Sequence, residues 1–169
     1  MNVFVTAGTQ FPFSRLDEVV NALVTIHPDW SVTYQSGPDS NVEVLSKLPL
    51  HKVSDLFTSD DFRFYFDSAD LVITHAGMGN VITCLEKGKP FVMFPRLSKY
   101  GEHRNNHQVD SANAISKIYS IPTFFSVSEL VRELPEIIQT LNSFTCSEDE
   151  LSLERKKFAA GLNDLLLSL

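Results

Sequence analysis

The sequence predicts one α/β domain in which a parallel β-sheet carries helices on both faces. Three observations predict it. Short runs of β-branched and aromatic residues, typical of buried strands, alternate along the chain with segments whose apolar residues recur at helical spacing. A strand, a glycine turn, a helix and a second strand follow one another near the middle of the chain, which is the order of a βαβ unit. The length of 169 residues is that of a single domain.

The first strand is expected at residues 2–7, a β-branched and aromatic run that Gly8 ends. A helix should follow from Ser14, interpreted as its N-cap, because the next apolar residues recur at helical spacing. These residues are Leu16, Val19, Val20, Leu23 and Val24. Two more strands and a short helix rich in aromatic residues are then predicted, at residues 31–35, 50–53 and 60–68.

The clearest elements lie in the middle of the chain. A buried strand, a glycine turn, a helix and a further strand are predicted at residues 70–74, 75–79, 80–87 and 89–94. A polar loop, a helix, a short strand and another helix follow at residues 95–104, 106–117, 119–123 and 128–141. We expect residues 1–141 to form the domain, and residues 142–169 to form a linker and a C-terminal amphipathic helix.

The net charge argues against nucleic acid as a partner. The chain has 14 Lys and Arg against 21 Asp and Glu, a formal charge of −7, whereas proteins that bind duplex nucleic acid normally have a basic surplus. One stretch is basic nonetheless, and it contains Lys87, Lys89, Arg96, Lys99 and Arg104. On an acidic chain it favours a small anionic ligand or an anionic lipid; a solvated surface is the alternative.

Cysteine usage and hydropathy indicate the compartment. Cys84 and Cys146 have no metal-type spacing, and we interpret Cys84 as a small core residue of its helix. The N-terminus lacks a basic segment followed by a long apolar run, and no stretch has the 18 or so apolar residues of a membrane span. A cytoplasmic protein is expected unless something tethers it.

The first candidate site is the glycine turn. Gly77, Met78 and Gly79 lie between a predicted strand and a predicted helix, where glycines let a phosphate approach free backbone N–H groups. The spacing is that of neither a dinucleotide fingerprint nor a P-loop. Gly8, Thr9 and the loop 95–104 also follow predicted strands, so three loops converge on the edge where open parallel sheets bind ligands.

Other polar residues are further candidates. Glu86 could bind a ribose diol, or be an exposed helix residue paired with a lysine. The polar run 101–108 contains amides and imidazoles suited to sugar hydroxyls, and Arg104 or His103 could meet a phosphate; a capped surface helix is the alternative. His103 and His107 have the spacing of a metal pair, but no third ligand is evident, so no metal is expected. His75 could be a base, a phosphate donor or a structural residue.

Together these motifs resemble a known family. The runs Thr74-His-Ala-Gly-Met-Gly79, Glu86-Lys-Gly-Lys-Pro-Phe-Val-Met-Phe-Pro95 and Gly101-Glu-His-Arg-Asn-Asn-His-Gln108 look like the C-terminal domain of glycosyltransferase family 28. The opening residues 3–13 match its short, stand-alone relatives. Those include the PssE-like subunits of two-component capsule and exopolysaccharide glycosyltransferases, and the catalytic subunit of the dolichol-linked GlcNAc transferase.

The resemblance implies a Rossmann-like GT-B C-terminal half that binds a UDP-sugar, inverts the anomeric centre and requires no metal or other cofactor. It implies that Gly77, Met78 and Gly79 hold the diphosphate and Glu86 the ribose. By the same resemblance, the donor sugar would be bound by His107 and Gln108, and the uracil would be bound near residues 52–57. Gly8 and Thr9 would line the cleft that faces the partner.

Such relatives work with a membrane-anchored partner that supplies the other half and the lipid-linked acceptor, so a peripheral place at the inner face of the membrane is implied. A general base is still required; His75 is the best candidate in this chain, and the partner is the alternative source. The apolar stripe of residues 151–169 could pack on its own domain, on the partner or on a membrane. Two other functions stay open: a non-catalytic enhancer subunit, and an unrelated nucleotide-binding regulator.

Overall fold

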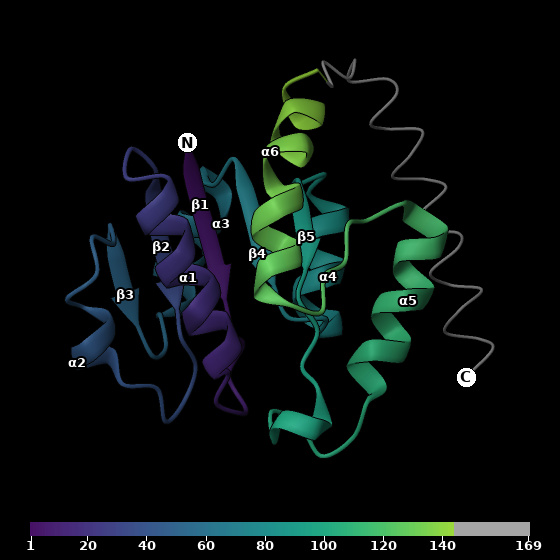
Figure 1. Cartoon of the computed structure of the whole chain (residues 1–169), viewed down its shortest axis with the longest axis horizontal. Coiled ribbons are helices and arrows are strands. Elements are labelled where there is room, and N and C mark those ends of the chain that lie inside the picture. Colours follow the sequence, from purple (N-terminus) through teal and green to yellow (C-terminus); the bar gives the residue numbers. More distant parts are fainter. Residues whose placement is uncertain (144–169) are drawn as a thin grey trace.

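A five-stranded parallel sheet forms the centre of the molecule (Figure 1). The structure, a computed structural model, describes residues 1–143, with side chains to residue 140. The strands stand in the order β3-β2-β1-β4-β5, and all four neighbouring pairs are parallel. They are β1 (Asn2–Thr6), β2 (Ser31–Gln35), β3 (Lys52–Ser54), β4 (Leu71–Thr74) and β5 (Phe91–Met93). The predicted parallel α/β sheet is confirmed.

Helices cover both faces of this sheet, as predicted. In Figure 1, α1 and α6 lie in front of the sheet, and α3 and α4 behind it. The helices are α1 (Ser14–Ile26), α2 (Val42–Leu45), α3 (Ser59–Ser68), α4 (Met78–Glu86), α5 (His107–Tyr119) and α6 (Val127–Ser143), with a short 3₁₀ turn η1 (Ser98–Tyr100). The short α2, between β2 and β3, was not predicted from the sequence.

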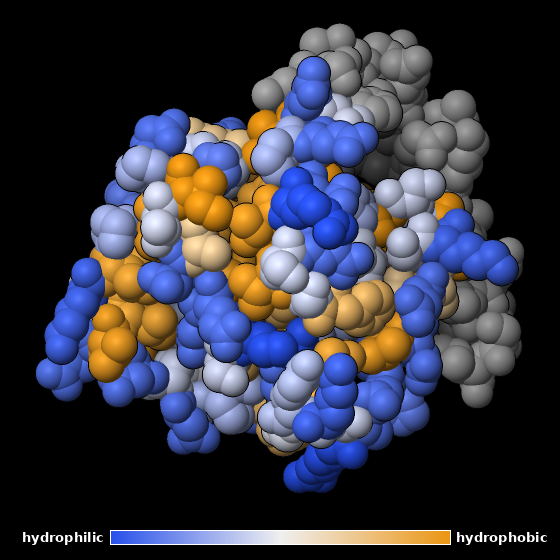
Figure 2. All heavy atoms as spheres, in the orientation of Figure 1, coloured by the Kyte–Doolittle hydropathy of each residue, from blue (hydrophilic) through white to orange (hydrophobic). Residues whose placement is uncertain are grey.

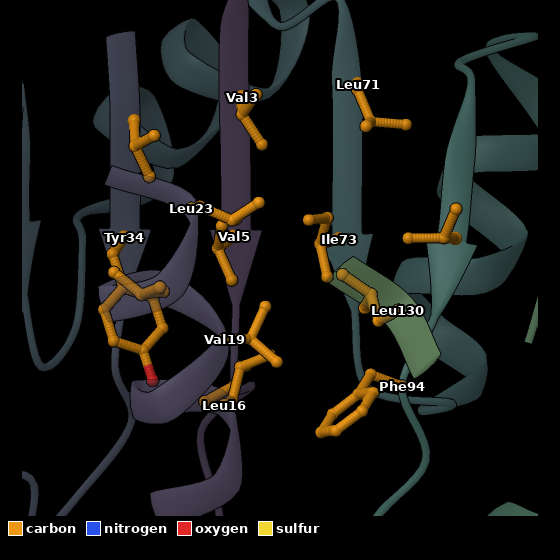
Figure 3. Close-up of a cluster of buried hydrophobic side chains, with 14 of the residues drawn as sticks. Val3, Val5, Leu16, Val19, Leu23, Tyr34, Leu71, Ile73, Phe94 and Leu130 are labelled. Carbon is orange, nitrogen blue, oxygen red and sulfur yellow. The ribbon is translucent and has the colours of Figure 1, made fainter. Parts of the chain in front are cut away.

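Alternation along the strands builds two separate cores. In β1, Val3 and Val5 pack with α1 and α6, whereas Phe4 points to the opposite face and packs with α3. Figure 3 shows the first core, in which side chains of β1 and β4 face Leu16, Val19 and Leu23 of α1 and Leu130 of α6. Successive side chains of a strand point to opposite faces of the sheet. A strand with consecutive apolar residues, such as Val3, Phe4 and Val5 of β1, therefore contributes to the core on both faces.

Two local predictions are wrong. Ser14 is not an N-cap: Phe13 occupies that position, and no side chain caps the helix. Phe13 is 2% exposed and stacks on Phe94 at 5.8 Å between ring centroids, so hydrophobic packing sets the start of α1. The predicted strand 119–123 is reduced to one parallel bridge from Thr123 to Met93, because α5 continues to Tyr119.

The chain beyond α6 lies outside the described residues. Asn142 and Ser143, predicted to begin a linker, still belong to α6. The predicted C-terminal amphipathic helix and Cys146 fall in residues 144–169, which are not described. Among the helices of residues 1–143, none is long and apolar enough to cross a membrane. Hydrophilic side chains cover much of the face in Figure 2, with apolar patches between them.

Candidate functional site

A cavity of about 870 Å³ opens at the carboxyl ends of the strands. The segments that follow β1, β3, β4 and β5 all contribute to its wall, together with α3 and the start of α4. This is the edge at which open parallel sheets bind ligands, because the loops and helix N-termini converge there. The predicted convergence of three loops on one edge is therefore confirmed.

Seven of the ten predicted site residues line this cavity. They are Gly8, Thr9, His75, Gly77, Met78, Gly79 and Gln108. The other three, Glu86, Arg104 and His107, are exposed and lie outside its lining. The structure thus brings together the residues of the glycine turn and of the first loop, and it places two residues of the polar run on the outer surface.

Glu86 is exposed at the end of α4 and is not among the residues that line the cavity. Gly79, Thr83 and Lys87 do line it, and their spacing of four residues places them along one side of the helix. Glu86 follows Gly79 by seven residues and Thr83 by three, so it lies toward that same side. Sequence reasoning missed Thr83, whose position one turn before Lys87 was the available signal. The Thr83 hydroxyl donates to the Gly79 carbonyl at 2.8 Å.

Arg104 and His107 are exposed and adjoin, in sequence, the lining residues His103 and Gln108. The Arg104 guanidinium lies 5.9 Å from the centroid of the Phe11 ring, and Phe11 itself contacts the His103 ring at 5.2 Å. Phe11 and His103 both line the cavity. His107 is the first residue of α5, and its backbone N–H donates to Oδ1 of Asn105. The structure therefore gives Arg104 a cation–π role at the rim.

The start of α4 is suited to binding an anion. Gly77 is its N-cap, and no side chain caps the helix. A β-carbon at Gly79 would meet no atom within 4 Å, so this first turn faces open space. The first N–H groups of a helix lack intrahelical partners and carry the positive end of its dipole. An uncapped helix N-terminus in a cavity is a site for a phosphate or carboxylate.

His75 lies between this turn and the first loop. Gly8 and Gly77 contact its imidazole from two directions, and a β-carbon at either residue would collide with the ring. Its Nδ1 is buried and has no hydrogen-bond partner among the described residues. Burial, with a further contribution from the Arg96 cation, lowers the pKa of His75 to about 4. The ring is therefore neutral at neutral pH, and as a base it is weak.

The lining of the cavity is basic although the chain is acidic. Arg63, Lys87 and Arg96 line it, whereas among residues 1–140 no Asp or Glu does. Lys87 also pairs with Asp67 at 2.6 Å. The basic stretch predicted from the sequence is not one patch, because Lys89 donates to the backbone carbonyls of Asp67 and Ala69 outside the cavity.

Apolar residues form another part of the cavity wall. Phe62 and Phe66 of α3 and Phe57 of the segment after β3 line the cavity. Gln35, at the end of β2, holds this segment: its side-chain oxygen accepts from the Phe57 N–H, and its amide donates to the Thr6 hydroxyl. Flat apolar rings suit a nucleobase. In the part of the chain that the structure describes, no group of three or more His, Cys, Asp or Glu could hold a metal.

Fold and site together define a Rossmann-like α/β protein with a basic cavity at the carboxyl edge of its sheet. The chain belongs to the glycosyltransferase family 28 C-terminal domain family, which matches residues 2–165. The human protein named UDP-N-acetylglucosamine transferase subunit ALG13 is 41% identical over 127 residues, covering 68% of this chain and 10% of that protein. An uncharacterized glycosyltransferase of Methanosarcina mazei is 37% identical over 108 residues, covering 64% of this chain and 28% of that protein.

A solved structure shows the same fold. MurG of Acinetobacter baumannii has a TM-score of 0.64 at 18% identity, and the match covers 99% of this chain and 50% of MurG. This chain therefore has the architecture of one half of a GT-B protein. It spans little more than a quarter of the Methanosarcina relative and a tenth of the human one.

Proposed function

We propose that this chain is the donor-binding subunit of a glycosyltransferase, that it binds a UDP-sugar in the cavity, and that a partner chain completes the enzyme. One observation carries the proposal: an uncapped helix N-terminus faces a cavity whose lining includes Arg63 and Lys87 and, among the described residues, no carboxylate. Such a site complements a diphosphate without a metal, because N–H groups and cations can stabilise the charge that develops on the leaving group.

Membership of the glycosyltransferase family narrows the ligand to an activated sugar. The human relative is named as a UDP-N-acetylglucosamine transferase subunit, which favours UDP and a two-chain enzyme. The backbone N–H groups of Gly77, Met78 and Gly79 would bind the diphosphate. Phe57 and the neighbouring apolar wall would take the uracil. Glu86, and Thr83 one turn before it on the same side of α4, are our candidates for the ribose, and Gln108 would meet the sugar.

The general base belongs, in this proposal, to the partner. Among the described residues no Asp or Glu lines the cavity, and His75, whose pKa is about 4, is a weak base at neutral pH. His75 would instead offer the donor a neutral imidazole from between Gly8 and Gly77. The need for an outside base is one reason to expect that the chain alone transfers sugar poorly.

The finer assignment rests on the sequence resemblance. We propose transfer of galactose or GlcNAc to a lipid-pyrophosphate-linked saccharide in capsule or exopolysaccharide synthesis. The partner would be membrane-anchored and would hold this chain at the inner face of the membrane. A panel of UDP-sugars offered to the purified two-chain complex, with a lipid-pyrophosphate acceptor, would identify the sugar by the product formed.

Calorimetric titration of the protein with UDP tests the ligand. UDP should bind more tightly than UMP, because the second phosphate meets the α4 N-terminus. The change Gly79→Asp should weaken UDP binding by about tenfold or more, since a carboxylate there repels the diphosphate; open space at residue 79 means the fold tolerates it. Asn113→Asp, which adds the same charge at an exposed position of α5 outside the cavity lining, is the matched control and should bind UDP like the wild type. Equal affinity of Gly79→Asp and wild type would contradict the proposed site.

The same variant separates the catalytic subunit from a non-catalytic enhancer. In the two-chain complex, Gly79→Asp should reduce sugar transfer in proportion to the lost UDP affinity. A complex that keeps full transfer with Gly79→Asp would identify this chain as an enhancer with an unused cavity. Preference for FMN or an adenine nucleotide over UDP in the binding screen would instead indicate the unrelated regulator.

A further inference from the structure

Arg96 is buried at the edge of the cavity, yet its guanidinium is engaged by the protein itself. The side chain is 2% exposed. One terminal nitrogen donates to the carbonyls of Pro12 and Glu102, at 2.6 and 3.2 Å, and the other to the carbonyls of Ala7 and Phe11, at 2.5 and 2.6 Å. Four of the five N–H donors of a guanidinium thus bind backbone oxygens. Burial lowers the pKa of Arg96 to about 10, so the group stays charged at neutral pH.

Three of these four carbonyls belong to the segment after β1, residues 7–12. This segment carries Gly8, Thr9 and Phe11 along the cavity wall. Within it, Gly8 has a φ of 78° and lies against the His75 ring. The position of Gly8 relative to His75 therefore depends on a segment whose carbonyls converge on a single cation.

The backbone of Arg96 contacts a second side of the cavity. Its N–H donates to Oε1 of Gln108 at 3.2 Å, which directs the amide of Gln108. Because this oxygen is engaged, the Nε2 donor of Gln108 is the end that can meet a ligand. Arg96 thus contacts both the first loop and the residue that we assign to the sugar.

We propose that Arg96 is a positioning residue of the donor cavity: it fixes residues 7–12 so that Gly8 closes over the neutral His75, and it does not itself bind the diphosphate. A buried cation held by carbonyls costs desolvation energy that an apolar residue would not, so its presence calls for a specific role. Fixing one wall of a binding cavity is such a role.

Arg15 provides a matched control. It is also a buried arginine, 9% exposed. It pairs with both carboxylate oxygens of Glu102 and donates to the carbonyls of Pro95 and Phe125. It therefore has a similar number of bonds and the same neighbour Glu102, but it does not line the cavity. A purely structural role for Arg96 predicts that the two arginines behave alike.

The experiment compares Arg96→Met with Arg15→Met in the full chain, by imidazole NMR titration assigned with His75→Gln. In the wild type and in Arg15→Met, His75 should titrate near pH 4. In Arg96→Met its midpoint should rise by about one pH unit or more, because a cation is lost and the ring gains solvent. Unchanged titration in Arg96→Met, or an equal rise in Arg15→Met, would overturn the proposal.

A second pair of variants applies if Arg96→Met fails to fold. Arg96→Lys keeps the charge, but the lysine has its three N–H donors on one nitrogen and cannot hold four carbonyls. The amides of Ala7 and Gly8 donate to the Gln35 carbonyl and the Thr6 hydroxyl. Their hydrogen exchange should be at least about tenfold faster in Arg96→Lys than in Arg15→Lys, since local opening becomes easier. Equal exchange in the two variants would overturn the proposal.

A third measurement, the UDP affinity of the same variants, rests on the proposed function. UDP affinity should fall about tenfold in Arg96→Met and less than about threefold in Arg15→Met, as expected when a binding wall loses its preorganisation. If UDP binds none of the proteins, the proposed function fails, whereas the titration and exchange results still decide the role of Arg96.

Discussion

Gly8 packs so closely on His75 that a β-carbon at residue 8 would lie 2.5 Å from Cε1 of the imidazole. These residues come from the ends of β1 and β4, which are neighbouring strands of the sheet. The contact joins the first loop to the glycine turn that begins α4. It also covers part of the imidazole, and this burial, together with the Arg96 cation, lowers the pKa of His75.

Replacing Gly8 tests this contact directly. Gly8→Ala should lower the free energy of unfolding by about 1–3 kcal/mol, for two reasons. The new β-carbon would collide with the His75 ring, and alanine would have to adopt a left-handed φ of 78°. Gly79→Ala is the control, because a β-carbon there meets open space, and it should leave stability unchanged or raise it by about 0.5–1 kcal/mol. Denaturant unfolding measures both. Equal free energies of unfolding for Gly8→Ala and the wild type would show that the His75 ring can move away from the β-carbon without loss of stability.

The His75 pKa makes stability depend on pH. The folded-state pKa, about 4, lies below the ordinary value of 6.5, so the unfolded chain binds more protons between these pH values. The contribution of neutral His75 to the stability of the fold is therefore fully present above pH 6.5. As the pH falls toward 4, the free energy of unfolding decreases by about 3 kcal/mol. Carboxylates contribute to the same pH range, so the measurement is the difference between wild type and His75→Gln. Parallel stability curves for the two proteins would be inconsistent with the lowered pKa.

The face of α4 that meets the ligand can be determined with two substitutions. Thr83→Val keeps the shape of the side chain but removes its hydroxyl, and it should weaken UDP binding about threefold or more if this hydroxyl contacts the ribose. Glu86→Gln removes the charge that would accept from the ribose hydroxyls, and it should weaken UDP binding by a similar or larger factor. Isothermal titration with UDP compares the two variants. Loss of affinity in only one variant would assign the ribose to that residue, and unchanged affinity in both would contradict both assignments.

Cys84 should be unreactive in the folded protein. It is buried in the core between α4 and the sheet, and burial raises the pKa of its thiol to about 12. Only the thiolate is strongly nucleophilic, so alkylation should require unfolding. The Cys146→Ser variant isolates this thiol, and the rate of iodoacetamide labelling should increase by orders of magnitude when denaturant is added. Rapid labelling of Cys84 without denaturant would show that the core opens at α4.

Most of the fold follows from local patterns. The runs that predict β1, β2 and β4 are apolar and β-branched, and the structure places these strands within one residue of the predicted bounds. The errors arise where packing overrides a local preference. Ser14 has the chemistry of an N-cap, but the burial of Phe13 against Phe94 moves the helix start by one residue.

For the site, the sequence by itself determined which loops carry it. Glycines after two strands and a polar run after a third mark the carboxyl edge, because parallel strands end on the same side. Only the tertiary structure decided which side chains face the cavity. On α4 the structure adds Thr83 to the lining of the cavity, whereas Glu86, which the motif favoured for the ribose, is exposed one turn further along the same side. Arg96 was predicted as part of a basic stretch that favours an anionic ligand, and its burial among carbonyls of the distant segment 7–12 is a contact that no local pattern specifies.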